Sequence, residues 1–280
     1  MNRAVFRHEA MATHWEIVIA GRDPEYARQA AAAAWREVDR LESELSRFVE
    51  YSDVARANRL ALGEAAAIGD DALQCLALAA GLAEATGHAF DAAFGTESDP
   101  ASEPGSPPFL LDPENHRIVS RARRLQIDLG AIGKGYALDR VGEVLREWEI
   151  TTACCHGGGS TVLALDPPPG ETGWPVGVGE GESHREIRLS RAALSASGIA
   201  AQGRHLIDPR TRRPATRATR VWARADTAAV SDAISTAFFV MADAEVGNFV
   251  AANAGIAAAL TTGNDLMIFG SLGPALSDTP

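Results

Sequence analysis

Cysteine is scarce in this 280-residue chain, which has only Cys75, Cys154 and Cys155. The last two are adjacent, so on a strand their side chains would point to opposite faces. An odd count without framework spacing argues against a disulfide scaffold, and the lack of any CxxC pair gives no support to a zinc site. We therefore expect all three thiols to be reduced.

Long apolar runs and an excess of positive charge are also missing. No stretch reaches the roughly 18 apolar residues that a membrane helix needs, and the first residues lack the apolar core of a signal peptide. We therefore expect a cytoplasmic protein. The net charge of −11 argues against non-specific nucleic-acid binding and against a basic membrane-surface patch. A phosphate-bearing ligand would need a metal ion, backbone N–H groups or a few well-placed cations.

The chain has the composition of a globular protein, with 46% apolar and 22% charged residues, which argues against wholesale disorder. Apolar periodicity predicts helices that begin at Asp23-Pro24, near Asp70 and after Gly135, and two more at about 227–241 and 243–254. We predict strands near 14–21, 117–129, 151–156, 161–165, 174–179, 184–190, 219–225, 256–261 and 266–270. Segment 97–108 is polar and rich in proline, which predicts a flexible surface loop. No linker is evident, so we expect one domain over 1–280.

The first chemical candidate is Ile127-Asp-Leu-Gly-Ala-Ile-Gly-Lys-Gly-Tyr136, which lies between a predicted strand and a predicted helix. Its glycines would let the backbone approach a ligand, and the helix N-terminus would favour a phosphate. Lys134 adds a positive charge. The spacing is not that of a Walker loop. A plain strand-to-helix turn would use the same glycines.

The second candidate is Ser231-Asp-Ala-Ile-Ser-Thr236, within a predicted helix. Asp232 and Thr236 are four residues apart and therefore face the same way, with Ser235 nearby. One carboxylate with hydroxyl oxygens fits Mg²⁺, which takes few protein ligands and completes its shell with phosphates and water. The alternative is a helix with a polar stripe.

The third candidate is His205-Leu-Ile-Asp-Pro209. His205 is the most plausible general base in the second half of the chain, because histidine titrates near neutral pH. The alternative is a strand that ends in an Asp-Pro turn.

These segments occur in the order found in a known family. Met11-Ala-Thr13 stands where the family has Met-Gly-Thr, and Thr86-Gly-His-Ala-Phe-Asp91 where it has Thr-Gly-Gly-Ala-Phe-Asp. The other matching segments are Leu45-Ser-Arg-Phe48 with Ser52 and Asn58, Asp128 to Tyr136 with Asp139, Gly157-Gly158, Ser197-Gly198, His205 to Thr211, and Asp232 to Thr236. Over nearly its whole length the chain resembles the ApbE-type FAD:protein FMN transferases.

The resemblance implies an α+β fold of two intimately packed α/β lobes with the ligand cleft between them. It implies Mg²⁺-dependent transfer of FMN from FAD to a Thr or Ser hydroxyl of an acceptor protein, with release of AMP. Asp232, Thr236 and the backbone oxygen of Ala131 would hold Mg²⁺, with Ser235 as a further oxygen. His205 would deprotonate the acceptor hydroxyl. The residues that would line the FAD pocket are Met11, Phe48, Ala89, Phe90, Asp91, Asp128, Lys134 and Ile207.

Several positions depart from the family pattern, chiefly on the acceptor and flavin side. Ala196 replaces a threonine, the segment from Ile199 to Arg204 is short, and Arg212 replaces a glycine. The proposed metal ligands are intact. Two alternatives to transfer therefore stay open, namely an FAD pyrophosphatase that produces FMN and AMP, and a flavin-binding derivative without turnover.

Overall fold

An antiparallel sheet of eight strands is the framework of the computed structural model, which describes residues 2–101, 103, 105–198, 207–215, 217–263 and 265–274. Every neighbouring pair of strands in it is antiparallel. In spatial order the strands are β1 (Arg3–Ala10), β2 (Thr13–Ala20), β8 (Ala153–Gly157), β9 (Thr161–Ala164), β12 (Ala192–Gly198), β15 (Arg220–Ala225), β16 (Ala257–Thr262) and β17 (Asp265–Phe269).

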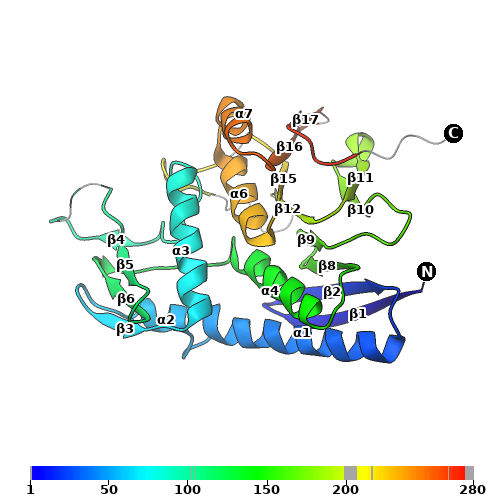
Figure 1. Cartoon of the computed structure of the whole chain (residues 1–280). Coiled ribbons are helices and arrows are strands. Elements are labelled where there is room, and N and C mark those ends of the chain that lie inside the picture. The colour runs from blue at the N-terminus through cyan, green and yellow to red at the C-terminus, as the bar shows by residue number, and fades with distance from the viewer. Residues whose placement is uncertain are drawn as a thin grey trace.

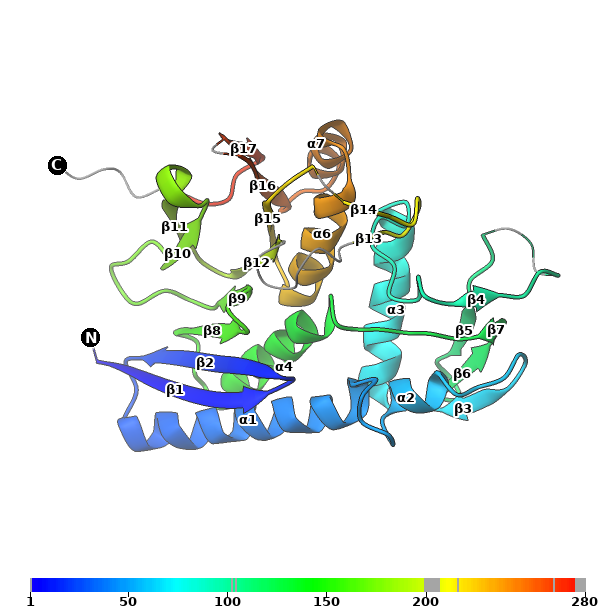
Figure 2. The same cartoon turned by 180° about the vertical axis from the view of Figure 1, so that it is seen from behind.

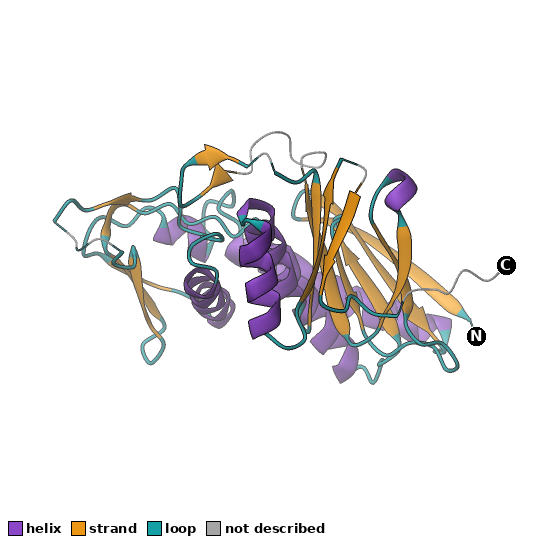
Figure 3. Ribbon diagram, turned by 90° about the horizontal axis from the view of Figure 1, so that it is seen from above, coloured by secondary structure: helices purple, strands orange, loops and turns teal. Residues whose placement is uncertain are grey.

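Three helices cover one face of this sheet: α1 (Pro24–Leu45), α4 (Gly133–Glu147) and α6 (Ala228–Val240) (Figure 3). Helix α1 begins where the Asp23 side chain accepts hydrogen bonds from two backbone N–H groups of the first turn. Its buried face is mostly small, with four alanines before Val38, Leu41 and Leu45. Helix α7 (Asp243–Ala252) follows α6 and contacts β16 and β17.

The opposite face of the sheet is covered by the hairpin of β10 (Trp174–Val178) and β11 (Arg185–Leu189), which are joined through the short 3-10 helix η1 (Gly181–Ser183). Trp174 and Ile187 of the hairpin belong to one buried apolar cluster with Trp222 of the sheet. The sheet therefore has an apolar layer on each side.

A second lobe projects from the helical side of the sheet (Figure 1). It contains α2 (Asp53–Ala57), α3 (Asp70–Ala85), the three-stranded sheet of β3 (Ala65–Ala67), β6 (Arg117–Ser120) and β5 (Phe109–Asp112), and the pair β4 (Glu97–Ser98) and β7 (Ala122–Arg124). Figure 2 shows the short hairpin of β13 (Ile207–Asp208) and β14 (Arg213–Pro214) beside the C-terminal end of α3.

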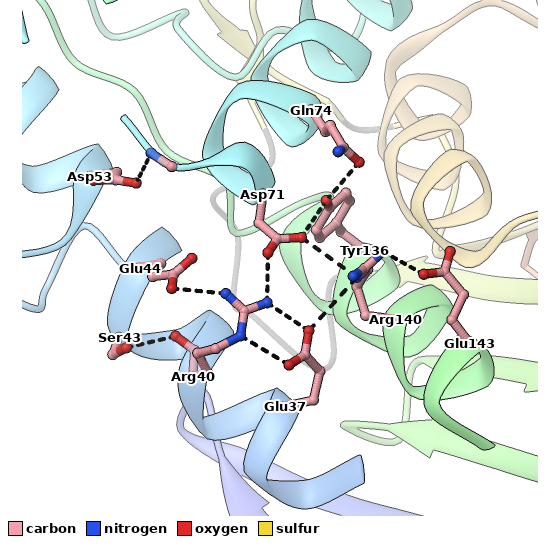
Figure 4. Close-up of polar contacts among 11 residues, drawn as sticks. Glu37, Arg40, Ser43, Glu44, Asp53, Asp71, Gln74, Tyr136, Arg140 and Glu143 are labelled. Carbon is pink, nitrogen blue, oxygen red and sulfur yellow. Dashed lines mark hydrogen bonds and ion pairs between the residues drawn. The ribbon is translucent and has the colours of Figure 1, made fainter. Parts of the chain in front are cut away.

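A charged network joins the two lobes where α1, α3 and α4 meet (Figure 4). The Asp71 carboxylate accepts from Arg40 at 2.6 Å and from the Tyr136 hydroxyl at 2.7 Å, and Arg140 Nε lies 3.5 Å from it. Arg40 also bonds Glu37. Burial acts to raise the pKa of Asp71, but the hydrogen bonds from Arg40 and Tyr136 hold it below its usual range. Asp71 is therefore a charged anchor between the lobes.

The structure confirms the predicted class, an α+β fold with two packed lobes, and every helix predicted above is present. Strands β1 and β12 were not predicted, and β4 lies inside the segment predicted as a flexible loop. All three cysteines are free and buried, as expected. Within the described residues, no helix combines the length and apolar character that crossing a membrane requires.

Candidate functional site

A cavity of about 1130 Å³ opens between the two lobes. The second lobe contributes the segment that follows α3, and the sheet contributes the β1–β2 turn, the glycine run after β8 and the end of β12. Eleven of the residues proposed above line it: Met11, Phe48, Ala89, Phe90, Asp91, Asp128, Ala131, Lys134, Ile207, Asp232 and Thr236. Segments more than 200 residues apart in sequence therefore meet in one space.

The turn before α4 is held by its own polar groups. Asp128 Oδ1 accepts from the Gly130 N–H at 2.9 Å, and Lys134 Nζ donates to the Gly130 carbonyl at 3.0 Å. Arg47, which also lines the cavity, has its Nε 3.2 Å from Asp128 Oδ2.

The N-cap residue of α4, Ile132, has no side-chain acceptor, and the first turn is instead capped from α6, where Asp232 accepts from the Gly135 N–H. The Gly133 N–H also donates to the Leu129 carbonyl, so a phosphate at this end of the helix would be favoured mainly by the positive end of the helix dipole.

The chain has 26 Lys and Arg residues, and all of them except Lys134 are arginine. The Lys134 side chain is 18% exposed, and Nζ lies 3.7 Å from Asp232 Oδ2. The only lysine ammonium of the protein thus lies in the cavity.

Helices α4 and α6 approach each other closely at Gly135. A Cβ atom at this position would lie 2.1 Å from the Ala228 carbonyl oxygen. Asp139, one turn further along α4, accepts from the N–H groups of Ala228 and Ala229 at 2.7 and 2.8 Å and so caps α6. Glycine and this cap together fix where the N-terminal half of α6 meets the cavity.

The carboxylate of Asp232 is only 5% exposed. Oδ2 accepts from the Gly135 N–H at 3.1 Å, and Oδ1 accepts from the Thr161 hydroxyl at 3.3 Å. Lys134, at 3.7 Å, is its one cationic neighbour among the described residues. A buried carboxylate is costly unless it is well paired, so this site favours a further cation.

Thr236 and Ser235 differ in orientation although they are adjacent. Thr236 lines the cavity. Ser235 is fully buried and does not, because its hydroxyl donates to the Asp232 carbonyl at 2.8 Å and lies 2.8 Å from Ser197 Oγ. The structure thus directs Asp232 and Thr236 toward the cavity and Ser235 toward β12.

The donor set fits Mg²⁺ with few protein ligands. Among the described residues no three His, Cys, Asp or Glu side chains come together as a metal cluster. A protein-only Ca²⁺ or Zn²⁺ cage is therefore not built from them, whereas Mg²⁺ is commonly held by one or two carboxylates with substrate phosphates and water. Asp232, Thr236 and the Ala131 backbone at the cavity wall supply oxygens of that kind.

The proposed flavin side of the cavity is apolar and open. Phe90 is buried, whereas Phe48 is 82% exposed and Arg47 lies over its ring at 4.5 Å. Met11 occupies the two-residue turn between β1 and β2, where it and Ala12 have φ values of 50° and 54°. Non-glycine residues rarely adopt such angles, and strained backbone of this kind is frequent at functional sites.

His205 lies outside the described residues, so its role as base stays a prediction. Six other histidines are described, and two of them, His88 and His156, are close in sequence to segments that line the cavity. His88 precedes the cavity segment and lies 3.8 Å from Asp91, with 61% of its side chain exposed. His156 lies 3.5 Å from Cys154 Sγ, and burial lowers its pKa.

Sequence reasoning assigned no role to several polar residues of the cavity wall. Thr13, Arg47, Ser160, Ser197 and Arg220 all line it. Ser197 was noted as part of a motif, but its contact with α6 depends on strand pairing that short polar stretches do not reveal.

The fold is that of solved flavin transferases. The ApbE flavin transferase of Vibrio cholerae superposes with a TM-score of 0.82 at 18% identity over 97% of each chain. The ApbE flavinyl transferase of Pseudomonas stutzeri, in its apo form, gives a TM-score of 0.78 at 20% identity over 95% of this chain and 94% of its own. The ApbE protein of Thermotoga maritima gives 0.79 at 25% identity over 96% and 97%.

The model of the ApbE family matches residues 11–260. This protein therefore belongs to the ApbE family, as the order of its motifs predicted. No curated protein sequence matches the chain.

Proposed function

We propose that the protein transfers FMN from FAD to a Thr or Ser hydroxyl of an acceptor protein and releases AMP, with Mg²⁺ as cofactor. The observation that carries this proposal is the convergence of Lys134, Asp232 and Thr236 on one cavity of about 1130 Å³ at the N-terminal end of α4. Membership in the ApbE family supports the same chemistry.

The two sides of the cavity suit the two halves of a flavin nucleotide. Lys134 and the first turn of α4 would attract the pyrophosphate. Met11, Phe48 and Phe90 offer apolar surface for a flat ring. Asp232, Thr236 and the Ala131 oxygen would hold Mg²⁺, which when bound would neutralise phosphate charge and stabilise the charge that develops on phosphorus.

The acceptor would approach from the open side, since Phe48 and Ile207 at the rim are 82% and 37% exposed. His205 follows the short segment 199–204 and precedes Ile207 in sequence. We propose that it takes the proton of the attacking hydroxyl as that hydroxyl bonds to phosphorus and the bond to AMP breaks.

The test is incubation of the protein with FAD, Mg²⁺ and a peptide that carries the acceptor motif of the family. We expect a covalently fluorescent peptide and one AMP per flavin transferred. Asp232→Ala should abolish transfer, whereas Asp265→Ala, an exposed residue of β17, should not.

Other outcomes have distinct meanings. FMN and AMP without labelled peptide would replace transfer with FAD hydrolysis. Bound, intact FAD together with an Asp232→Ala variant that behaves like wild type would indicate a flavin-binding protein without turnover. A failure to bind FAD would contradict the whole proposal.

A further inference from the structure

We infer that Ser197 is a positioning residue that turns the Thr236 hydroxyl so that its lone pairs face the cavity. The inference rests on the proposed function, because Thr236 belongs to the proposed Mg²⁺ site. A chain of hydroxyl groups between β12 and α6 fixes where each hydroxyl proton points.

The chain has three links. Ser235 Oγ is 2.8 Å from the Asp232 carbonyl oxygen, Ser197 Oγ is 2.8 Å from Ser235 Oγ, and Thr236 Oγ1 is 3.3 Å from Ser197 Oγ. These are the hydrogen bonds that the described residues provide for Ser197 and Thr236 side chains. Each hydroxyl has one proton to donate and lone pairs to accept with.

The direction of every link follows from the carbonyl at its end. A carbonyl oxygen can only accept, so the Ser235 proton points to Asp232. Ser235 must then accept from Ser197, which commits the single Ser197 proton. Ser197 can therefore only accept from Thr236. The Thr236 proton is thus directed backward, away from the cavity.

This orientation matters because a metal ion binds oxygen lone pairs and is repelled by a hydroxyl proton that points at it. Thr236 lines the cavity, one helical turn from the buried Asp232 carboxylate. With its proton held by Ser197, Thr236 presents lone pairs on the side that Asp232 also faces. Ser235 was predicted above as a further ligand. It is instead fully buried, and its hydroxyl donates to the Asp232 carbonyl at the end of the chain of hydroxyl groups.

The same strand provides a matched comparison. Ser195 precedes Ser197 by two residues and so faces the same way. It is buried, its Oγ lies 2.9 Å from Ser231 Oγ, and it does not line the cavity. Ser195 and Ser197 both link β12 to α6 through a hydroxyl pair, but only Ser197 reaches a cavity residue.

The test compares equilibrium binding of Mn²⁺, followed by the loss of the free-ion EPR signal, in Ser197→Ala, Ser195→Ala and Ser197→Thr. Loss of a group that orients a metal ligand typically weakens metal binding by 10- to 100-fold, so we expect an increase of at least about tenfold in the Kd of Ser197→Ala. Ser195→Ala should bind as wild type does, and Ser197→Thr, which keeps the hydroxyl, should restore affinity. Thermal unfolding identifies any variant that fails to fold.

Equal Mn²⁺ affinity in folded wild-type and Ser197→Ala protein would overturn the inference. An equal loss in Ser195→Ala would also overturn it, since the effect would then come from helix–strand packing. A third outcome concerns the proposed function itself. If wild type and Asp232→Ala bind Mn²⁺ equally, or neither binds it, the proposed metal site at Asp232 is wrong.

Discussion

At the scale of single residues, Lys134 is distinguished by the absence of any other lysine from the chain. Arginine is larger and planar, and it offers its charge in a fork rather than at one point. The 3.0 Å bond to Gly130 and the neighbouring Asp232 leave a compact space for an ammonium. A guanidinium at this position would therefore meet the two oxygens with a different geometry.

We predict that Lys134→Arg weakens FAD binding roughly tenfold, about 1.4 kcal/mol, as measured by quenching of flavin fluorescence. Arg36→Lys, an exposed change on α1, is the control and should have no effect. Because Lys134 carries the only ε-amine, mass spectrometry of acetylated protein gives a second measurement, and FAD should slow acetylation there. Unchanged affinity together with unprotected Lys134 would show that FAD lies elsewhere.

Three residues occupy backbone positions where the family motifs have glycine. Ala12, His88 and Arg212 have φ values of 54°, 60° and 56°. The left-handed region costs a residue with a Cβ atom roughly 1–2 kcal/mol. At all three positions the backbone thus has a conformation that glycine adopts more easily.

We predict that Ala12→Gly raises the free energy of unfolding by roughly 0.5–1 kcal/mol, because relief of strain exceeds the added entropy of the unfolded chain. Urea denaturation measures it. Ala10→Gly, in the regular part of β1, should lower stability instead. A loss of stability in Ala12→Gly would indicate that the strain is not relieved by removing Cβ.

At the scale of elements, the contact between α4 and α6 decides the geometry of the site. We predict that Gly135→Ala lowers stability by roughly 1–3 kcal/mol, because its methyl group would overlap the Ala228 carbonyl. Mn²⁺ binding should weaken as well, since the Gly135 N–H holds Asp232.

Gly81→Ala in α3 is the matched control for this change. A Cβ at Gly81 would meet no atom within 4 Å, so the variant should gain roughly 0.5–1 kcal/mol from helix propensity. Equal stability changes in the two variants would contradict the close packing of α4 on α6.

Asp139 of α4 caps α6, and its ionisation makes the stability of the contact between the two helices depend on pH. Burial raises its pKa to about 6, against the lowering effect of the Ala229 and Ala228 N–H groups. The folded protein therefore binds the proton more tightly than the unfolded chain. The stability that Asp139 contributes is present below pH 3.8 and is lost as the pH rises through about 6.

We predict that the free energy of unfolding of wild type falls relative to Asp139→Asn between pH 4 and pH 7, as measured by urea denaturation across that range. If the helix dipole instead stabilises the charged form of Asp139, the free energy of unfolding of wild type will rise relative to that of Asp139→Asn as the pH rises. That opposite slope would contradict the raised pKa.

Sequence patterns located the elements that have their own periodicity and missed those that depend on partners. The α1 stripe and the Asp23 cap were visible, because both are local. Strand β1 was overlooked at the edge of the sheet, and β12 was hidden by its small polar residues Ser195 and Ser197. The motifs indicated Asp232 and Thr236, but only the folded contact shows that Ser235 turns away.

At the scale of the whole molecule, the charged network around Asp71 ties the second lobe to α1 and α4 (Figure 4). Such a connection favours one cooperative unit, and we propose that residues 1–280 form a single domain. The proline-rich stretch 97–108 contains β4 at its start, and we propose that the remainder is a flexible loop.

We predict one unfolding transition, seen at the same urea concentration by tryptophan fluorescence and by circular dichroism. Limited digestion of folded protein with elastase, which cuts after small residues such as Ala101, should cut first within 97–108, and the two fragments should stay associated. Two separate transitions, or a first cut between the lobes elsewhere, would contradict a single domain.

The central claim is that one cavity holds FAD and Mg²⁺ together. A crystal structure of the protein with FAD and Mg²⁺ tests it most directly. We predict a metal ion bound by Asp232, Thr236 and the Ala131 carbonyl oxygen, a pyrophosphate at Lys134, and the flavin ring beside Met11 and Phe48. FAD bound outside this cavity, or within it with no metal at Asp232, would contradict the claim.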